Sequence, residues 1–380
     1  MHLERFDSAA FLRDHWQQRP LLIRNPWSDW INPLEPDELA GLAGEPDVES
    51  RLVVTKGESW KVEPGPIPEK RFAKLGKKPW TLLVQAVDHQ VAEVAALIAP
   101  FRFVPNWRID DVMVSYASDG GGVGPHFDQY DVFLIQGLGR RRWRIGGRCN
   151  ADTPLRPHDD LRLLADFAAE QEWVLEPGDI LYVPPGVAHE GVAVGDDCMT
   201  YSIGFRAPAR SELIAHWTDH VLSGQSEDDR YADPRLPAQA NPGEITPAAL
   251  AKLHAMVTDA LLDRDAFARW FGSYTTAPKY PDVDWRPDEP IAPEALRGRL
   301  ADGAALVRNP ASRFAFIRED TGTARLFVDG QDHICNADTA LFAERLCSAD
   351  RTATAPDLSP PVLALIATLI DAGSLAFEDD

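Results

Sequence analysis

A chain of 380 residues is long for one hydrophobic core, so two or three compact units are expected. Its net charge of −21 disfavours binding to nucleic acid or acidic membranes, and it serves either solubility alone or the attraction of basic proteins. The four cysteines, Cys149, Cys198, Cys335 and Cys347, form no C-x-x-C pair, which argues against a zinc knuckle or a disulfide framework and fits a reducing cytoplasm.

Neither end of the chain predicts insertion into a membrane. The first sixteen residues contain acidic side chains and no long apolar run, so they do not resemble a signal peptide. The longest apolar run, Val362–Ile370, is too short to cross a bilayer. A cytoplasmic protein is therefore expected.

The first hundred residues predict short helices and strands in alternation. Apolar spacing and proline positions indicate helices over 7–18, 36–42 and 91–98, and strands over 21–23, 50–55, 60–62 and 79–84. From residue 110 the pattern becomes a series of short strands broken by glycine and proline: 110–117, 126–136, 140–146, 172–176, 179–184, 189–194 and 198–206. Regularly spaced strands of this kind predict a jelly-roll barrel of the cupin type.

After Pro208 the periodicity becomes helical. Helices are predicted over 210–222, 247–262 and 263–274, and this block is too small for a core of its own, so it should pack on the barrel or on a second copy. Residues 277–290 contain four prolines and indicate a linker. The remainder predicts helices at 293–301, 338–347 and 359–372, with strands at 305–308, 314–318 and 325–328, an order compatible with a winged-helix-like domain.

The predicted fold class is therefore α+β, with four parts in the chain. Residues 1–207 form the barrel, 208–276 a helical segment, 277–290 a linker, and 291–380 the winged-helix-like domain.

Three residues of the barrel predict a metal site. His126 and Asp128 are two residues apart, so on a strand that opens at His126 their side chains project from one face. His189 follows two tight-turn signals, Glu176–Asp179 and Pro184–Gly186, that return the chain toward this pair. Two imidazoles and one carboxylate suit Fe(II) with open coordination positions, and the competing reading is a buried structural histidine pair. Another histidine, His158, lies in the polar loop Arg156–Asp160 without a strand context and is expected to be exposed.

An arginine-rich strand predicts an anion site. Arg140, Arg141, Arg142 and Arg144 lie on a strand expected to return after Gly137–Gly139. Arg141 shares a face with Trp143 and Ile145, which favour the interior, so Arg141 is the inward arginine and can bind a carboxylate bidentately. The alternative is that all four arginines are exposed. Ser115 could donate a hydrogen bond to the same carboxylate.

Four segments together resemble the JmjC-type ribosomal oxygenases: GGGVGPHFDQYDVF, GRRRWRIG, PGDILYVPPGVAHEG and YSIGFRAP. The resemblance covers the whole chain and is greatest to the bacterial branch, which hydroxylates an arginine of large-subunit ribosomal protein sixteen. It implies a double-stranded β-helix (JmjC/cupin jelly-roll) that binds Fe(II) through His126, Asp128 and His189. It also implies 2-oxoglutarate anchored by Arg141 and a homodimer built by the central helices.

The family has a serine that helps to bind the cosubstrate at a position where this chain has Ala117, with Ser115 two residues earlier, so the second carboxylate contact is open. The resemblance implies that decarboxylation of 2-oxoglutarate to succinate drives hydroxylation of a basic ribosomal protein. Asp111, Asp119, Tyr130 and Asp131 are candidate substrate contacts by proximity in sequence.

Other functions remain open at this point. A JmjC demethylase or a histidyl hydroxylase acting on another basic protein would use the same ligands. A silent barrel that regulates nucleic acid through its C-terminal domain is disfavoured, because residues 281–380 carry 18 acidic and nine basic side chains, a net charge of −9. A cupin isomerase would not need Arg141 or 2-oxoglutarate.

Overall fold

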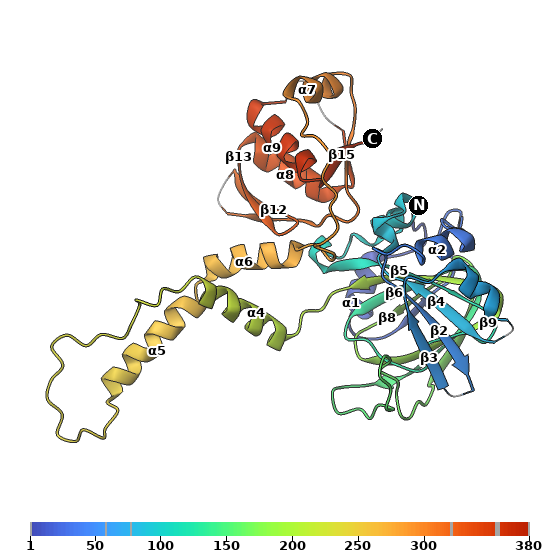
Figure 1. Cartoon of the computed structure of the whole chain (residues 1–380), viewed down its shortest axis with the longest axis horizontal. Coiled ribbons are helices and arrows are strands. Elements are labelled where there is room, and N and C mark those ends of the chain that lie inside the picture. Colours follow the sequence, from blue (N-terminus) through green and yellow to red (C-terminus); the bar gives the residue numbers. More distant parts are fainter. Residues whose placement is uncertain (1, 58, 77, 320–321, 354–357, 379–380) are drawn as a thin grey trace. The chain divides into compact units, whose positions relative to one another are not determined.

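The computed structural model describes residues 2–57, 59–76, 78–319, 322–353 and 358–378, and the chain divides into two compact units (Figure 1). The first unit comprises Met1–Ala207, Asp282–Arg286 and Val307–Ala311. The second comprises Pro208–Pro281, Pro287–Leu306 and Ser312–Asp380. Each unit has its own hydrophobic core.

The first unit is built on a nine-stranded sheet in the order β1-β8-β6-β9-β5-β4-β2-β3, with β7 paired to β6. Its strands are β1 (Leu21–Ile23), β2 (Ser50–Lys56), β3 (Ser59–Pro64), β4 (Trp80–Val84), β5 (Ile109–Ala117), β6 (Asp131–Arg148), β7 (Gln171–Leu175), β8 (Ile180–Val183) and β9 (Val187–Phe205). The long strands β6 and β9 pair antiparallel along most of their lengths, and β5 pairs with β9 on its other edge. This topology confirms the predicted jelly-roll.

Alternate residues of these strands face two different cores. On β6, Phe133 and Ile135 belong to the larger core, whereas Val132 and Leu134 belong to a smaller cluster with Trp143. Successive side chains of a strand point to opposite faces, so the two sets lie on opposite sides of β6. The smaller cluster, which contains Trp143, lies on the interior side of the barrel. Polar groups on that interior face are therefore the ones available to a site inside the barrel.

Short helices cover the larger core. They are α1 (Ser8–Asp14), α2 (Pro36–Leu42), α3 (Ala92–Ala95) and the 3₁₀ turns Glu69–Lys74, Val87–His89, Ala96–Phe101 and Asn106–Arg108. The α1 residue Phe11 is 2% exposed and packs edge-on against Tyr182 of β8, with ring centroids 4.8 Å apart. Helix α2 begins at a capping box formed by Glu35 and Glu38, with Pro36 in its first turn.

The second unit begins with three helices, α4 (Arg210–Ser223), α5 (Pro247–Leu261) and α6 (Arg264–Thr276). Helices α4 and α6 share an aromatic cluster in which the Trp217 and Trp270 ring centroids are 5.4 Å apart, and the Trp217 indole N–H donates to the carbonyl of Leu261 in α5. The chain then forms α7 (Pro293–Ala301), α8 (Asp338–Ser348) and α9 (Pro360–Asp371), with strands β10 (Leu306–Arg308), β11 (Phe314–Arg318), β12 (Thr323–Val328), β13 (Gln331–Asn336), β14 (Arg351–Thr352) and β15 (Leu375–Phe377). The sheet β11-β12-β13 packs against α6 and α8.

The structure corrects several predicted boundaries. The chain does not reverse at Gly137–Gly139: β6 continues through it, and bulges on either side of Leu138 absorb the irregularity. Likewise 189–194 and 198–206 form the single strand β9. Residues 126–130 are not part of a strand, because β6 begins at Asp131.

Three further elements differ from expectation. Helix α1 ends at Asp14 instead of residue 18, and α3 is shortened to Ala92–Ala95 because the following turn contains Pro100 and is 3₁₀. The prediction missed β13, although Asp329–Gly330 is a recognised hairpin signal. Within the part of the chain that the structure describes, no helix has both the length and the apolar character needed to span a membrane.

Candidate metal and cosubstrate site

Two backbone segments bring the candidate histidines together. His126 and His189 form an isolated antiparallel bridge, in which each backbone N–H donates to the other residue's carbonyl at 3.0 and 2.8 Å. His126 follows Gly124, whose φ of +80° favours glycine, and His189 lies near the start of β9. The bridge restores strand-like geometry at His126 although no regular strand forms there.

The two histidines are held in the same tautomer. The Nδ1 of His126 lies 2.9 Å from the carbonyl of Gly124, and the Nδ1 of His189 lies 3.0 Å from the carbonyl of Val187. A carbonyl can only accept, so each Nδ1 carries the proton and each Nε2 keeps its lone pair. Metal-binding histidines are commonly oriented by such a second hydrogen bond.

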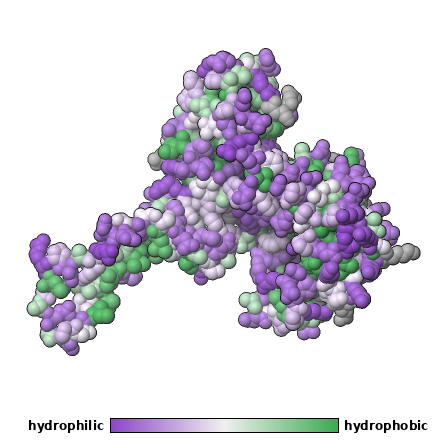
Figure 2. All heavy atoms as spheres, in the orientation of Figure 1, coloured by the Kyte–Doolittle hydropathy of each residue, from purple (hydrophilic) through white to green (hydrophobic). Residues whose placement is uncertain are grey.

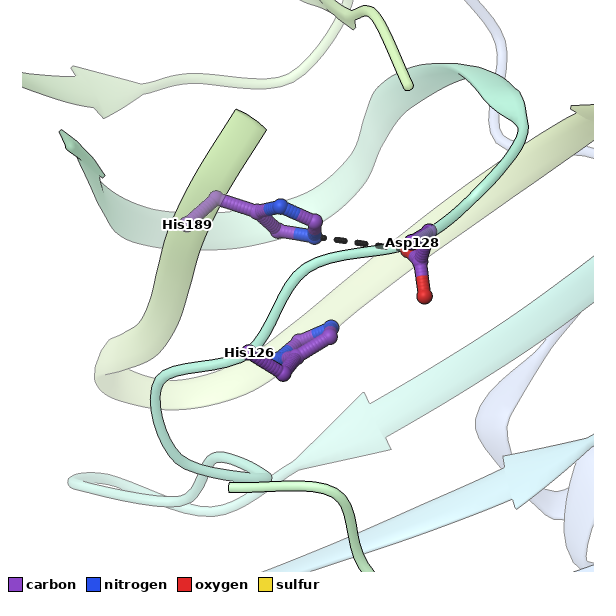
Figure 3. A group of neighbouring side chains, drawn as sticks. All are labelled: His126, Asp128 and His189. Atoms are coloured by element: carbon purple, nitrogen blue, oxygen red, sulfur yellow. Dashed lines mark ion pairs between the residues drawn. The ribbon is translucent and has the colours of Figure 1, made fainter. Parts of the chain in front are cut away.

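Asp128 completes the group, as Figure 3 shows. One carboxylate oxygen lies 3.6 Å from His189 Nε2, and the His126 and His189 ring centroids are 4.4 Å apart. The candidate donor atoms of the three residues all lie within 4.8 Å of one another. The backbone carbonyl of Asp128 accepts from Gly186, which links it to the turn before β9. The structure therefore brings all three predicted ligands together.

The electrostatics of the group suit a cation. Burial, followed by the electrostatic interaction with the neighbouring His126 imidazole, lowers the pKa of His189 to about 4, although Asp128 opposes the shift. His189 is consequently neutral at pH 7, and its Nε2 lone pair faces the carboxylate of Asp128. Two acceptors that face each other at this distance repel unless a cation lies between them, so the donor set fits Fe(II).

Arg141 is buried on the barrel interior, at 4% exposure, while Arg140 and Arg142 are exposed and Arg144 is half-buried. Its Nη2 donates to the Ser115 hydroxyl at 3.5 Å, and its Nε has no partner. Among the described residues, no carboxylate lies within ion-pair distance of Arg141. A buried cation without a counter-ion is costly, so this guanidinium fits a bound carboxylate such as that of 2-oxoglutarate.

Two buried polar groups on the barrel interior were not predicted as site residues. Thr81 of β4 pairs with Ala117 and is 1% exposed, and its hydroxyl has no partner. The Nε1 of Trp143 is also buried without a partner, and its ring centroid lies 5.8 Å from the Arg141 guanidinium carbon and 5.9 Å from the His189 ring centroid. For Thr81 the available sequence signal was a threonine in the otherwise apolar run Trp80–Val84.

The remaining sequence candidates lie in different environments. Asp131 is fully buried and binds Tyr182, Gln17 and Arg108, so it cannot contact a substrate. Asp111 is also buried and accepts from the backbone of Ala86.

Of the other two candidates, Asp119 accepts from Gly195 at the surface. Tyr130 is 42% exposed and remains near the site, where burial and the charge of Asp128 raise the pKa of its hydroxyl. The prediction for His158 was wrong: the side chain is half-buried and both ring nitrogens are hydrogen-bonded.

Comparison with known proteins assigns the chain to a family. Residues 96–213 match the JmjC domain model, 255–376 match a ROXA-like winged helix, and 167–262 match an AraC-like ligand binding domain. The chain is 41% identical over 97% of both lengths to the ribosomal protein uL16 3-hydroxylase of Escherichia coli. The chain belongs to the JmjC-type ribosomal oxygenases. A probable ribosomal oxygenase of Haemophilus influenzae is 36% identical, with 86% of this chain and 82% of that protein covered.

Solved structures of the ribosomal oxygenase family agree over the whole chain. The X-ray structure of Escherichia coli YcfD has a TM-score of 0.89 and 38% identity, and each chain is completely covered. The same protein in complex with cobalt and 2-oxoglutarate has a TM-score of 0.86 at the same identity and coverage. The winged-helix match confirms the predicted C-terminal architecture, while the domain boundaries stay predictions.

Proposed function

We propose that this chain is an Fe(II)- and 2-oxoglutarate-dependent oxygenase that hydroxylates an arginine side chain of a large-subunit ribosomal protein. The observation that carries the proposal is the convergence of His126, Asp128 and His189, with the unpaired Arg141 inside the same barrel. The relative named uL16 3-hydroxylase supports the substrate class. The related structure in complex with cobalt and 2-oxoglutarate supports the cosubstrate.

The chain's own residues have distinct roles in this proposal. His126, Asp128 and His189 would hold the metal, and a set of two imidazoles and one carboxylate leaves it positions for other ligands. Arg141 binds the distal carboxylate of 2-oxoglutarate, and the hydroxyls of Ser115 and Thr81 lie on the same interior face to donate hydrogen bonds. When bound, the iron and 2-oxoglutarate supply the oxidising power for attack on an unactivated C–H bond, with succinate and carbon dioxide as by-products.

The barrel interior supplies the dry surroundings that this chemistry needs. Val132, Leu134, Leu181 and Val183 are each at most 4% exposed and form one cluster with Trp143. Their packing excludes water from this part of the barrel interior, which would limit side reactions of the bound cofactors.

The substrate is a basic protein in this proposal. A net charge of −21 attracts a basic ribosomal protein and accelerates encounter, most strongly at low salt. Ribosomal proteins are made and modified in the cytoplasm, where this enzyme would act. Direct binding to nucleic acid is not part of the proposal, because the acidic C-terminal residues would repel phosphate.

The central helices support a homodimer. No residue of α5 is buried, and its apolar residues Leu250, Leu253 and Val257 are 54%, 42% and 59% exposed. Figure 2 shows hydrophobic side chains gathered along this helix. An amphipathic helix whose apolar stripe is uncovered needs a partner surface, and a second copy of the same stripe supplies one.

Mass spectrometry of a peptide tests the proposed reaction. The purified full-length protein is incubated with Fe(II), 2-oxoglutarate, oxygen and an arginine-containing peptide of the large-subunit protein uL16. We expect a mass increase of one oxygen atom on the arginine. The increase should be absent with His126→Ala and retained with His2→Ala, which removes an imidazole at an exposed position.

The other outcomes separate the competing functions. Succinate formation without oxidation of this peptide would keep the oxygenase and reject the substrate. A panel with histidine-containing and methyl-lysine peptides would then identify a histidyl hydroxylase or a demethylase. If neither succinate nor an oxidised peptide forms while the metal is bound, the oxygenase assignment is wrong.

A further inference from the structure

The loop between β6 and β7 packs on the segment that carries His126. The backbone N–H of Leu164 donates to the carbonyl of Pro125 at 2.9 Å, and Leu163 is 2% exposed. A Cβ on Gly124 would lie 2.9 Å from Leu163 Cδ2 and 2.9 Å from Trp60 Cζ2. Gly124 is therefore enclosed by Leu163 of the loop and by Trp60 of β3.

One imidazole joins this loop to β3. The Nδ1 of His158 accepts the backbone N–H groups of Asp160 at 3.0 Å and Leu161 at 3.1 Å. Its Nε2 lies 2.9 Å from the carbonyl of Trp60. Because N–H groups only donate and the carbonyl only accepts, the proton must be on Nε2 and the ring must be neutral. His158 thus shapes the loop with one nitrogen and tethers it to β3 with the other.

Gly124 links the segments joined by His158 to the candidate metal ligand His126. The carbonyl of Gly124 accepts the Nδ1 proton of His126 at 2.9 Å, and this hydrogen bond sets the direction of the imidazole. Leu163 and Trp60, which enclose Gly124, come from the two segments that His158 connects. A shift of the loop relative to β3 would therefore move the carbonyl that orients His126.

We propose that His158 is a positioning residue for His126: its hydrogen bonds to Trp60, Asp160 and Leu161 clamp the loop and β3 around Gly124. This proposal rests on the proposed function, because it assigns His126 to a metal. His158 itself contacts neither the metal nor the cosubstrate. Loss of the clamp should weaken metal binding and change the ligand field, while the fold remains.

Two conservative substitutions separate the two halves of the clamp. In His158→Asn the side-chain oxygen can replace Nδ1 as acceptor for Asp160 and Leu161, but the tether to Trp60 is lost. In His158→Gln the amide can replace Nε2 as donor to Trp60, but the turn loses its acceptor. His158→Ala removes both. Asp159→Ala, at an exposed neighbouring position, is the matched control.

The readout is Co(II) binding to the full-length protein, measured by titration and by the visible absorption spectrum of the bound ion. Loss of a group that orients a metal ligand weakens binding by about 10–100-fold, and the indirect contact of His158 places His158→Ala near the lower limit. We expect His158→Asn to show most of the affinity loss of His158→Ala, with an altered spectrum. The loss of Co(II) affinity should be smaller in His158→Gln, and Asp159→Ala should match wild type. Thermal unfolding of each metal-free variant checks that it folds.

Several results would overturn the inference. One is wild-type Co(II) affinity and spectrum in both His158→Asn and His158→Gln, and these two variants decide the question if His158→Ala does not fold. Another is an equal loss of affinity in Asp159→Ala, which would indicate a general effect of the loop. Failure of wild type itself to bind Co(II) would instead reject the proposed function and remove the basis of this proposal.

Discussion

At the scale of single residues, the site is defined by buried groups that the protein itself leaves unsatisfied. The Nε2 of His189 faces the carboxylate of Asp128, and both are acceptors at pH 7. Arg141 is a buried cation without an acidic partner among the described residues. A metal ion would satisfy the two facing acceptors, and a carboxylate ligand would neutralise Arg141. The site therefore offers unpaired acceptors for a cation and an unpaired positive charge for an anion.

The replacement Arg141→Met should change stability and binding in opposite directions. Methionine has a similar volume and removes a costly buried charge, so the ligand-free protein should be at least as stable to heat as wild type. Removal of a buried charge partner costs about 2–5 kcal/mol of binding, which corresponds to a loss of 2-oxoglutarate affinity of thirtyfold or more. Calorimetric titration of the manganese-loaded protein measures the affinity, and Arg142→Met at the exposed neighbouring position is the control. Wild-type affinity in Arg141→Met would exclude this arginine from the cosubstrate site.

At the scale of secondary-structure elements, close contacts decide how the helices pack on the sheets. Helix α6 meets β12 where Gly272 lies against the ring of Phe327, which is fully buried. A Cβ on Gly272 would lie 2.3–2.5 Å from three atoms of that ring. The absence of a side chain at this position therefore allows α6 to pack against the sheet of the winged-helix-like domain.

Two glycine-to-alanine substitutions in helices should have opposite effects. Alanine favours a helix over glycine by about 1 kcal/mol, while an overpacked core costs about 1–3 kcal/mol. Gly298 of α7 has nothing within 4 Å of its hypothetical Cβ, so Gly298→Ala should stabilise its domain. In Gly272→Ala the clash should prevail. Amide hydrogen exchange in Thr323–Val328 should become faster with Gly272→Ala, and unchanged exchange would show that the ring of Phe327 moves aside without cost.

At the scale of the whole molecule, surface charge and an uncovered apolar helix govern association. The acidic surface favours a basic protein partner, and this attraction should weaken as salt screens it. The exposed stripe Leu250, Leu253 and Val257 instead favours association between copies of the chain through apolar burial. The two surfaces therefore respond to different solution conditions.

The replacement Val257→Asp should dissociate the proposed homodimer. A carboxylate in the centre of a paired apolar stripe would be buried without a partner, and in a homodimer the two copies would also repel. Light scattering after size-exclusion chromatography should change from a dimer mass to a monomer mass. Ala248→Asp, which introduces the same charge on the opposite side of α5, should leave the mass unchanged. A monomeric wild-type protein would reject the dimer before any variant is made.

Local sequence determined the elements and most of the candidate site. Period-two alternation separated the inward Arg141 from its exposed neighbours Arg140 and Arg142, because a strand places successive side chains on opposite faces. Turn signals and apolar spacing located most helices and strands. The identity of His126, Asp128 and His189 as a group also followed from residue type and spacing, since few patterns combine two imidazoles and a carboxylate in this way.

Tertiary structure decided what depends on contacts between distant segments. Strand pairing with β9 carried β6 straight through Gly137–Gly139, where local sequence indicated a reversal. Burial removed Asp111 and Asp131 from the substrate candidates, and the pairing of β4 with β5 brought Thr81 beside Ala117. The hydrogen bond of His158 to the carbonyl of Trp60, on a strand 98 residues earlier, could not be read from its own loop. In each case the deciding energy comes from partners that are remote in sequence, which no local pattern encodes.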